Sequence, residues 1–298
     1  MFAQQVLNGL VMGGVYALFA LGFTLIFGIH RIMNLSHGAV MMVGAFMALY
    51  AVRFGLPFWA AMLLAMAAGG LLSVVVEFFA FRPLRSLSIA DAEFGSMISS
   101  IGMGLFIMSI AQRLSRTEVM RFPFGTVPVE SVEVFGLRVT SIQLLILGCA
   151  ILLVGVLAAY LYRTPNGRQI RAVAGNQRTA QLLGVNPDFI FFQTFFLSGA
   201  LAGAAGVLVG LAFNSIHYMM GEPYLLRGFV AIVLGGMGSV PGALAGGLVL
   251  GLMQSMSAAY LPALITDAII FALLFVILLI RPAGLFGTTP PEGVTRRI

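Results

Sequence analysis

The sequence has no lysine, a single cysteine and few charged residues of any kind. Without lysine it cannot form the phosphate-binding loop G-x-x-x-x-G-K-[ST], so this chain has no ATP site of that type. Cys149 has no second cysteine to pair with, and its place inside an apolar run predicts a buried, unreactive thiol. Charged residues make up 9% of the chain, whereas a typical soluble domain has about a quarter. An ordinary soluble domain is therefore excluded.

The sequence is rich in long apolar runs. Hydrophobic residues are 60% of the 298, and the mean hydropathy is +1.05. A helix needs ~20 mainly apolar residues to cross a bilayer. The main runs are 6–29, 56–81, 94–111, 142–162, 189–213, 243–260 and 267–280, and two shorter ones are 39–52 and 228–242. They predict one all-α polytopic membrane domain over 1–298, with about eight to nine transmembrane helices.

Arginines in the short loops predict the orientation, because cytoplasmic loops carry the excess of basic residues. These arginines are Arg82 and Arg85, then Arg163, Arg168, Arg171 and Arg178, then Arg281, Arg296 and Arg297. All of them fall in the cytoplasm if the N-terminus lies outside and the tail 281–298 lies inside. The long loop 112–140 then faces outward, and its arginines do not conflict, since long loops translocate largely regardless of charge. The net charge of +6 therefore indicates orientation and not a nucleic-acid partner.

Two apolar stretches are interrupted by polar or glycine-rich residues, one in each half of the chain, at 30–38 and 235–242. Paired breaks of this kind are typical of a transporter's substrate path, because non-helical backbone at membrane depth must be buried in protein or line a cavity. The alternatives are an ordinary turn at the membrane surface and, for the second break, simple packing of small residues. The candidate path residues are Asn34, Ser36, His37 and Gly38, then Gly235, Gly236, Gly238 and Ser239.

The segment 163–188 is predicted to fold into two short helices between two spans. Its helix-capping residues are Thr164, Asn176 and Asn186, and Gly184 is placed to end the second helix. Orientation alone explains the four arginines of the segment. Its apolar positions, such as Ile170, Val173 and Leu183, are not needed for orientation and indicate a surface for a partner protein or the membrane.

Four motifs in order carry a family resemblance. They are Arg31-Ile32-x-Asn34-x-x-His37-Gly38, the run from Gly167-Arg168-x-x-Arg171 through Asn176 to Gly184-Val185, Leu234-Gly235-Gly236-Met237-Gly238-Ser239-x-x-Gly242, and Arg281-Pro282-x-Gly284-Leu285-Phe286-Gly287. In this order they cover nearly the whole chain. Together they resemble the branched-chain amino-acid ABC transporter permeases of the LivH type.

The resemblance implies a non-catalytic, multi-pass permease subunit of the bacterial inner membrane. Its partners would be a second, LivM-like permease, two ATP-binding subunits and a periplasmic amino-acid-binding protein, besides membrane lipid and the small-molecule substrate. The segment 163–188 would be the coupling loop on an ATPase. The residues facing that ATPase would be Arg168, Arg171, Asn176, Leu183 and Gly184. The loop departs from the Glu-Ala-Ala loop of many other ABC permeases, since Arg171-Ala172 and Asn176 stand there instead.

Other functions stay open. A permease of the same family for urea or short amides would carry the same motifs. A secondary transporter or channel that works without ATPases is disfavoured, because the spans have almost no carboxylates for ion coupling. An intramembrane hydrolase is disfavoured because Ser239 is not in a G-x-S-x-G turn and H-E-x-x-H does not occur. The sequence predicts no catalytic residue, no metal and no cofactor.

Overall fold

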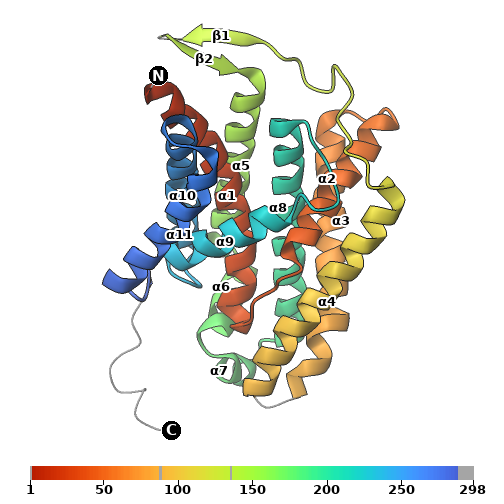
Figure 1. Ribbon diagram of the computed structural model, residues 1–298. Coiled ribbons are helices and arrows are strands. Elements are labelled where there is room, and N and C mark those ends of the chain that lie inside the picture. Colours follow the sequence, from red (N-terminus) through yellow and green to blue (C-terminus); the bar gives the residue numbers. More distant parts are fainter. Residues whose placement is uncertain (1, 87–88, 135, 288–298) are drawn as a thin grey trace.

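The computed structural model describes residues 2–86, 89–134 and 136–287. Long helices stand roughly side by side in a bundle, with a β-hairpin beyond one end and the short helices α6 and α7 at the other (Figure 1). We call these the hairpin end and the α6–α7 end. The described part of the tail that follows the last helix stops at Gly287.

The helices are α1 (Phe2–His30), α2 (His37–Arg53), α3 (Phe58–Val76), α4 (Ile89–Ser115), α5 (Ser141–Arg163), α6 (Pro165–Gly175), α7 (Gln177–Leu182), α8 (Pro187–Phe213), α9 (Glu222–Gly235), α10 (Val240–Tyr260) and α11 (Ala263–Ile280). A π-helical turn (Glu77–Phe81) and a 3-10 turn (Arg82–Ser86) extend α3. The strands β1 (Ser131–Val134) and β2 (Leu137–Thr140) pair antiparallel, with Ser131 opposite Thr140.

Six helical segments within the described residues are long and apolar enough to cross a membrane. They are Phe2–His30, Phe58–Arg85, Phe94–Ser115, Ser141–Arg163, Pro187–Phe213 and Val240–Tyr260, while His37–Arg53 and Ile265–Ile280 are shorter apolar helices. The prediction of a mostly helical membrane protein is confirmed. The predicted count of eight to nine spans is not confirmed, because α2 and α9 begin inside the bundle and are too short to cross a bilayer by themselves.

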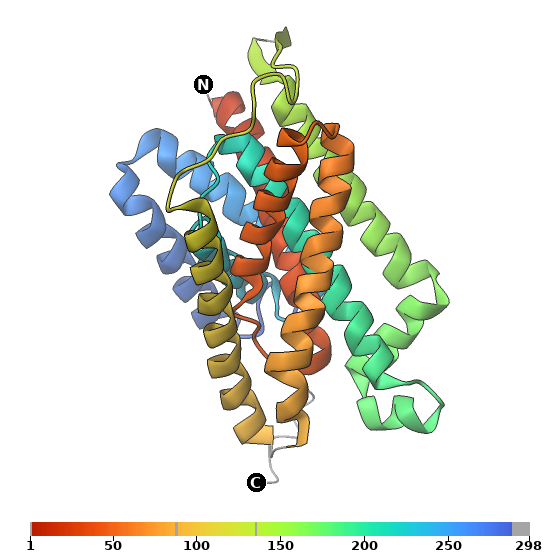
Figure 2. The same cartoon turned by 90° about the vertical axis from the view of Figure 1, so that its right-hand side faces the viewer.

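Helices α1 and α8 form the centre of the bundle, as the two perpendicular views show (Figures 1 and 2). Their apolar stretches are 83% buried, against 22–39% for the other four candidate spans. Glycines on α8 permit this packing: a Cβ on Gly203 would overlap the backbone of Ala65 in α3, and one on Gly206 would overlap that of Met41 in α2. Close approach through small residues is how membrane helices associate, so these glycines explain how α8 packs closely against α2 and α3.

One cluster of charges fastens α3 to the start of α8 at the α6–α7 end. The Arg85 guanidinium binds the Glu77 carboxylate and, at 2.6 Å, the carboxylate of Asp188. It also lies over the ring of Phe191, 4.2 Å from the ring centre. Arg82, although nearer to Glu77 in sequence, lies over the Phe78 ring instead. The side chain of Glu77 is 9% exposed, so this carboxylate depends on Arg85 for its counter-charge.

Candidate functional site

The first predicted break is a stretch of non-helical backbone inside the bundle. Helix α1 ends at His30, and α2 begins at His37, after six intervening residues. Arg31 turns the chain with a left-handed backbone at φ 53°. The Ser36 hydroxyl donates to Asn34 Oδ1 at 2.6 Å, and the Ser36 N–H donates to the same oxygen at 3.1 Å. The buried side chains of Asn34 and Ser36 thus provide hydrogen bonds within the non-helical segment, as backbone at membrane depth requires.

His37 is buried among aromatic rings and is held by α1. Its Nε2 lies 3.3 Å from the Phe19 carbonyl oxygen, and the rings of Phe19 and Phe23 meet it edge-on. Gly22 leaves the space that the imidazole fills. His37 Nδ1 and Asn34 Nδ2 are buried polar atoms without a partner among the described residues. The side chains of Asn34, Ser36 and His37 therefore stabilise the non-helical segment. Of the four predicted path residues in this segment, Gly38 lines a cavity.

A second break, at 214–221, meets the first one in space. The chain leaves α8 through Asn214, in the left-handed region at φ 44°, and α9 begins at Glu222. The backbones of Gly38 and Gly221 lie so close that a Cβ on Gly38 would stand 2.7 Å from the Gly221 carbonyl oxygen. The sequence-based reading pairs 30–38 with 235–242, whereas the structure joins it to 214–221. The Pro223 that follows Glu222 is a helix-start signal that could have located this break.

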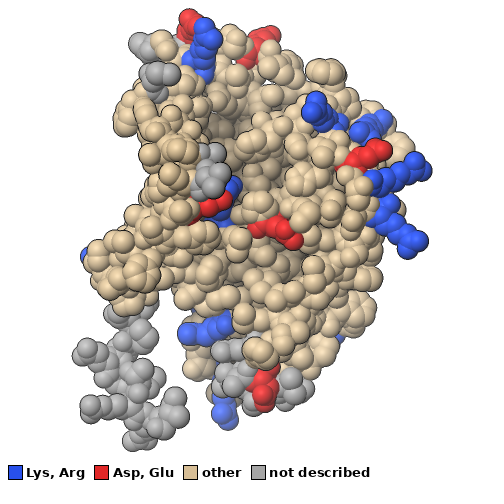
Figure 3. Space-filling model, viewed as in Figure 1, with Lys and Arg blue, Asp and Glu red and all other residues tan. Residues whose placement is uncertain are grey.

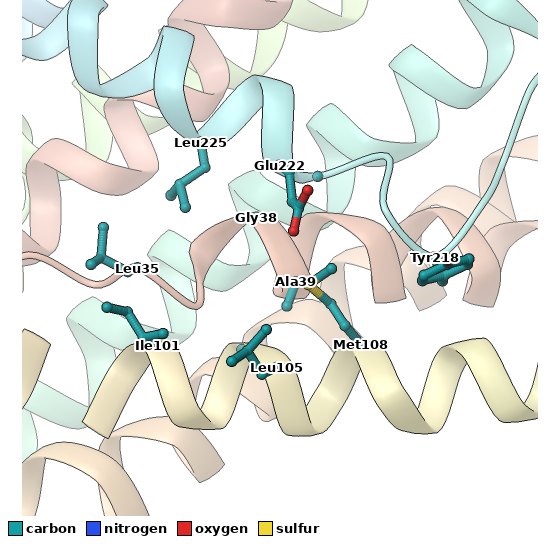
Figure 4. A pocket seen from close by; sticks show the side chains of 11 residues that line it. Leu35, Gly38, Ala39, Ile101, Leu105, Met108, Tyr218, Glu222 and Leu225 are labelled. Carbon is teal, nitrogen blue, oxygen red and sulfur yellow. The ribbon is translucent and has the colours of Figure 1, made fainter. Parts of the chain in front are cut away.

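A cavity of about 160 Å³ opens where these two breaks meet helix α4. Its walls come from α2, α4, α9 and the residues preceding α9. The lining residues are Leu35, Gly38, Ala39, Ile101, Gly104, Leu105, Met108, Tyr218, Gly221, Glu222 and Leu225. Ile101, Leu105 and Met108 rise from α4 on one side, and Glu222 faces them from α9 (Figure 4). The cavity is apolar apart from the Tyr218 ring hydroxyl and the Glu222 carboxylate.

The predicted break 235–242 is a tight turn between α9 and α10. Gly236 and Gly238 hold positive φ angles of 103° and 84°, and the Ser239 hydroxyl caps α10 by accepting the Gly242 N–H at 3.2 Å. The tail pairs with the turn, because the N–H groups of Leu285 and Phe286 donate to the carbonyls of Leu234 and Gly235, both at 2.9 Å. Gly235 and Gly236 therefore pack against backbone.

Gly238 and Ser239 line a second cavity, of about 200 Å³, toward the α6–α7 end. The rest of its wall comes from Thr24, Leu25, Gly28 and Ile29 of α1, Leu161 and Tyr162 of α5, Ile170, Arg171 and Ala174 of α6, and Val240 of α10. Two sets of residues that the sequence analysis kept separate, one for a substrate path and one for coupling, thus share one cavity. Of the eight predicted path residues, Gly38 lines the first cavity, and Gly238 and Ser239 line the second.

The segment 163–188 folds as two short capped helices, and the predicted caps are confirmed. Thr164 accepts the Gly167 N–H at 3.0 Å, Asn176 accepts that of Thr179 at 2.9 Å, and Asn186 accepts that of Asp188 at 3.0 Å. Gly184 is left-handed at φ 86°. The structure places the five predicted coupling residues Arg168, Arg171, Asn176, Leu183 and Gly184 on the exposed side of the segment.

The apolar residues of this segment fall into a buried group and an exposed group, which the sequence analysis did not predict. Ile170, Val173 and Ala180 are buried against the bundle, at 3%, 2% and 2% exposure. Leu182 and Leu183 are instead exposed, at 82% and 79%. The reading of Ile170 and Val173 as part of a partner surface is therefore wrong, because these side chains attach α6 to the protein itself. The exposed apolar surface is the pair Leu182 and Leu183.

Arg171 connects α6 to the end of α5. Its guanidinium donates to the Leu161 carbonyl oxygen and lies 5.2 Å from the centre of the Tyr162 ring. The last carbonyls of a helix lack intrahelical partners, and an arginine is a suitable donor for them. A displacement of α6 would therefore pull on α5 and on the wall of the second cavity.

The sequence analysis missed a polar network that joins α1, α9, α10 and α11. Arg227 on α9 donates to Asp267 at 2.9 Å and to the Tyr16 hydroxyl at 3.2 Å, and Tyr16 in turn donates to Gln254. In the sequence, Arg227 stands directly before the apolar run 228–242, and Asp267 is the first residue of the run 267–280. Their separation of 40 residues leaves no local signal for the pair.

Comparison with known proteins identifies the family. The family described as branched-chain amino acid transport system / permease component matches residues 5–278. The high-affinity branched-chain amino acid transport permease BraD of Pseudomonas aeruginosa is 32% identical, over 98% of each chain. LivH of Escherichia coli K12 is also 32% identical over 98% of each chain, and LivM of Salmonella typhimurium is 26% identical over 76% of this chain and 57% of LivM. The chain therefore belongs to the branched-chain amino acid transport permease family.

Proposed function

We propose that this chain is a membrane-spanning permease subunit of a binding-protein-dependent ABC importer that moves branched-chain or related amino acids into a bacterial cell. The observation that carries the proposal is the 32% identity to BraD and LivH over 98% of the chain. Both of those proteins are named as high-affinity branched-chain amino acid permeases. The missing lysine supports an ATPase on partner chains, because this chain has no phosphate-binding loop of its own.

The proposed topology has the hairpin end in the periplasm and the α6–α7 end in the cytoplasm of the inner membrane. The described arginines of the short loops, from Arg82 to Arg281, support this orientation. The chain then crosses the membrane nine times. This count takes the segment 31–36 with α2 as one crossing, and the segment 214–221 with α9 as another. The loop 112–140 with its β-hairpin then lies on the periplasmic side. The likeness to LivM supports pairing with a second, related permease. The proposal adds two ATP-binding subunits, because this chain has no phosphate-binding loop.

The transport activity is tested in proteoliposomes that contain this chain with its candidate permease, ATPase and binding-protein partners. We expect leucine, isoleucine or valine to accumulate only when ATP and the binding protein are both present. Urea and a short amide serve as competitors that test the alternative substrates of the same family. Accumulation without any ATPase subunit would contradict the proposal and favour a secondary transporter or a channel.

We propose that α6 and α7 form the coupling element and that Leu182 and Leu183 insert into a cleft on an ATPase subunit. The two leucines are exposed, whereas Ile170 and Val173 anchor α6 in the bundle. Arg171 then transmits a displacement to the end of α5 through the Leu161 carbonyl. Exposed apolar side chains on a folded, capped segment indicate a contact surface.

Replacing Leu183 with aspartate is expected to lower the partner-dependent ATPase stimulation by at least about tenfold, because docking would bury a carboxylate without a partner. Arg171→Ala is expected to lower transport more than ATPase docking, since Arg171 holds α6 to α5. Phe124→Asp is the matched control, since Phe124 is an exposed apolar residue in the loop 112–140, away from the coupling segment. Undiminished stimulation in Leu183→Asp together with Leu182→Asp would remove the coupling role.

A further inference from the structure

The cavity between α2, α4 and α9 has the chemical form of an amino-acid site. One wall is aliphatic, with Ile101, Leu105 and Met108 from α4, and Leu225 from α9 lies near Leu35 at one end (Figure 4). The Glu222 carboxylate points into the same space toward Gly38 and Ala39 at the start of α2. A single acid among aliphatic side chains fits a ligand with one positive group and an apolar body.

Distances along helices α1 and α2 both place the cavity well inside the membrane thickness. A Cβ on Gly22 of α1 would stand 3.0 Å from the His37 ring, and Gly22 precedes the end of α1 by eight residues, or ~12 Å at 1.5 Å per residue. From Gly38 to Arg53, the other end of α2, the rise is ~22 Å. Both values fall within a hydrocarbon core of ~30 Å. The face containing α9 carries most of its charged side chains at its two ends (Figure 3).

Glu222 differs from the other two acids of the membrane region. Glu77 is paired with Arg85, and Asp267 is paired with Arg227. Among the described residues, the Glu222 carboxylate is in none of the ion pairs, which join Glu77, Asp188, Glu133 and Asp267 to arginines. Glu222 is exposed and lines the cavity, and an ionisable side chain at membrane depth marks a contact with a substrate or an ion. A carboxylate that opens onto a cavity without its own counter-charge is suited to receive a cation.

The opposite charge is supplied by the first turn of α2. Gly38 and Ala39 line the cavity, and they lie in the first turn, where the N–H groups of a helix have no intrahelical partner. The helix dipole adds partial positive charge at this end. Gly38 has no side chain between its backbone and the cavity that it lines. The cavity thus presents a carboxylate and a set of backbone donors within one small volume.

We infer that this cavity binds the zwitterionic head and aliphatic side chain of the transported amino acid. The Glu222 carboxylate accepts hydrogen bonds from the ammonium group, and the first turn of α2 donates to the substrate carboxylate. Leu35, Ile101, Leu105, Met108 and Leu225 contact the branched side chain. The inference rests on the proposed function and adds to it the residue that recognises the amino group.

The test compares Glu222→Gln with wild type in the reconstituted importer, with Glu118→Gln in the outward loop as a matched control. We expect leucine uptake by Glu222→Gln to fall about 100-fold, because a site that bonds a charged group discriminates strongly when its partner is lost. Stimulation of ATP hydrolysis by the leucine-loaded binding protein is expected to stay within about twofold of wild type, because Glu222 is remote from the coupling element. Glu222→Asp, which keeps the charge, is expected to restore part of the uptake.

A second variant keeps the test decisive if Glu222→Gln fails to assemble. Leu225→Phe narrows the cavity and is expected to lower leucine uptake relative to valine uptake by about tenfold, the scale of one methylene group in an apolar pocket. Wild-type uptake in Glu222→Gln, or an unchanged leucine-to-valine ratio in Leu225→Phe, would overturn the inference and leave the importer proposal standing. Failure of the wild-type complex to import any amino acid with ATP would instead overturn the proposed function and, with it, this inference.

Discussion

Replacing Arg85 with leucine is expected to destabilise the folded protein by about 3–5 kcal/mol, the range for removing one partner of a buried ion pair. The loss comes mainly from Glu77, whose side chain is 9% exposed and whose counter-charge is Arg85. Removing the guanidinium leaves a buried carboxylate without its ion-pair partner. The contact with Asp188 adds little, because that carboxylate is 71% exposed and exposed pairs contribute at most about 1 kcal/mol.

The measurement is the free energy of unfolding in detergent, followed by the loss of helical signal. Arg82→Leu is the matched control, since Arg82 is exposed and lies over the Phe78 ring, and it is expected to cost less than about 1 kcal/mol. Glu77→Leu combined with Arg85→Leu is expected to recover most of the loss, because apolar replacement of both partners removes the stranded charge. An equal loss in the single and the double variant would show that Arg85 acts through its packing on Phe191 and not through Glu77.

The parts of the structure that the sequence predicts are those that depend on neighbouring residues. Thr164, Asn176 and Asn186 cap helices because a side-chain oxygen reaches an N–H two or three residues ahead. Ser239 caps α10 for the same reason. The glycines of α8 likewise predict close helix packing. These features can be recognised without knowing which distant segments of the chain contact one another.

The parts that sequence analysis misses depend on contacts between distant segments. Glu222 and Arg227 are charged residues beside an interrupted apolar run, so local rules place them in an outer loop. The structure instead turns 214–221 back into the bundle, where Gly221 packs on Gly38 and Arg227 binds Asp267. The apolar side chains of Ile170 and Val173 indicate that another surface packs on this face of α6. The sequence does not show whether that surface belongs to a second protein or to the same chain, so the prediction of a partner surface was wrong.

The contact between the two breaks also gives the chain a point at which a small change has a large effect. Gly38→Ala places a Cβ 2.7 Å from the carbonyl oxygen of Gly221 and 3.1 Å from its carbonyl carbon. Backbone atoms cannot rotate away as a side chain can, so the starts of α2 and α9 have to separate. Overpacking of this kind costs about 1–3 kcal/mol. It also shifts Glu222, the residue next to Gly221, relative to the first turn of α2.

We expect Gly38→Ala to lower ATP-dependent leucine uptake by about 100-fold, since a shift near 1 Å in a binding geometry has effects of that order. Gly102→Ala in α4 is the matched control, because a Cβ there meets no atom within 4 Å, and a helical glycine replaced by alanine loses no helix propensity. Comparing the melting temperature with uptake separates the two consequences of the substitution. A Gly38→Ala protein that melts and transports like Gly102→Ala would show that α2 and α9 can separate freely, and the joined breaks would then have no part in positioning the substrate.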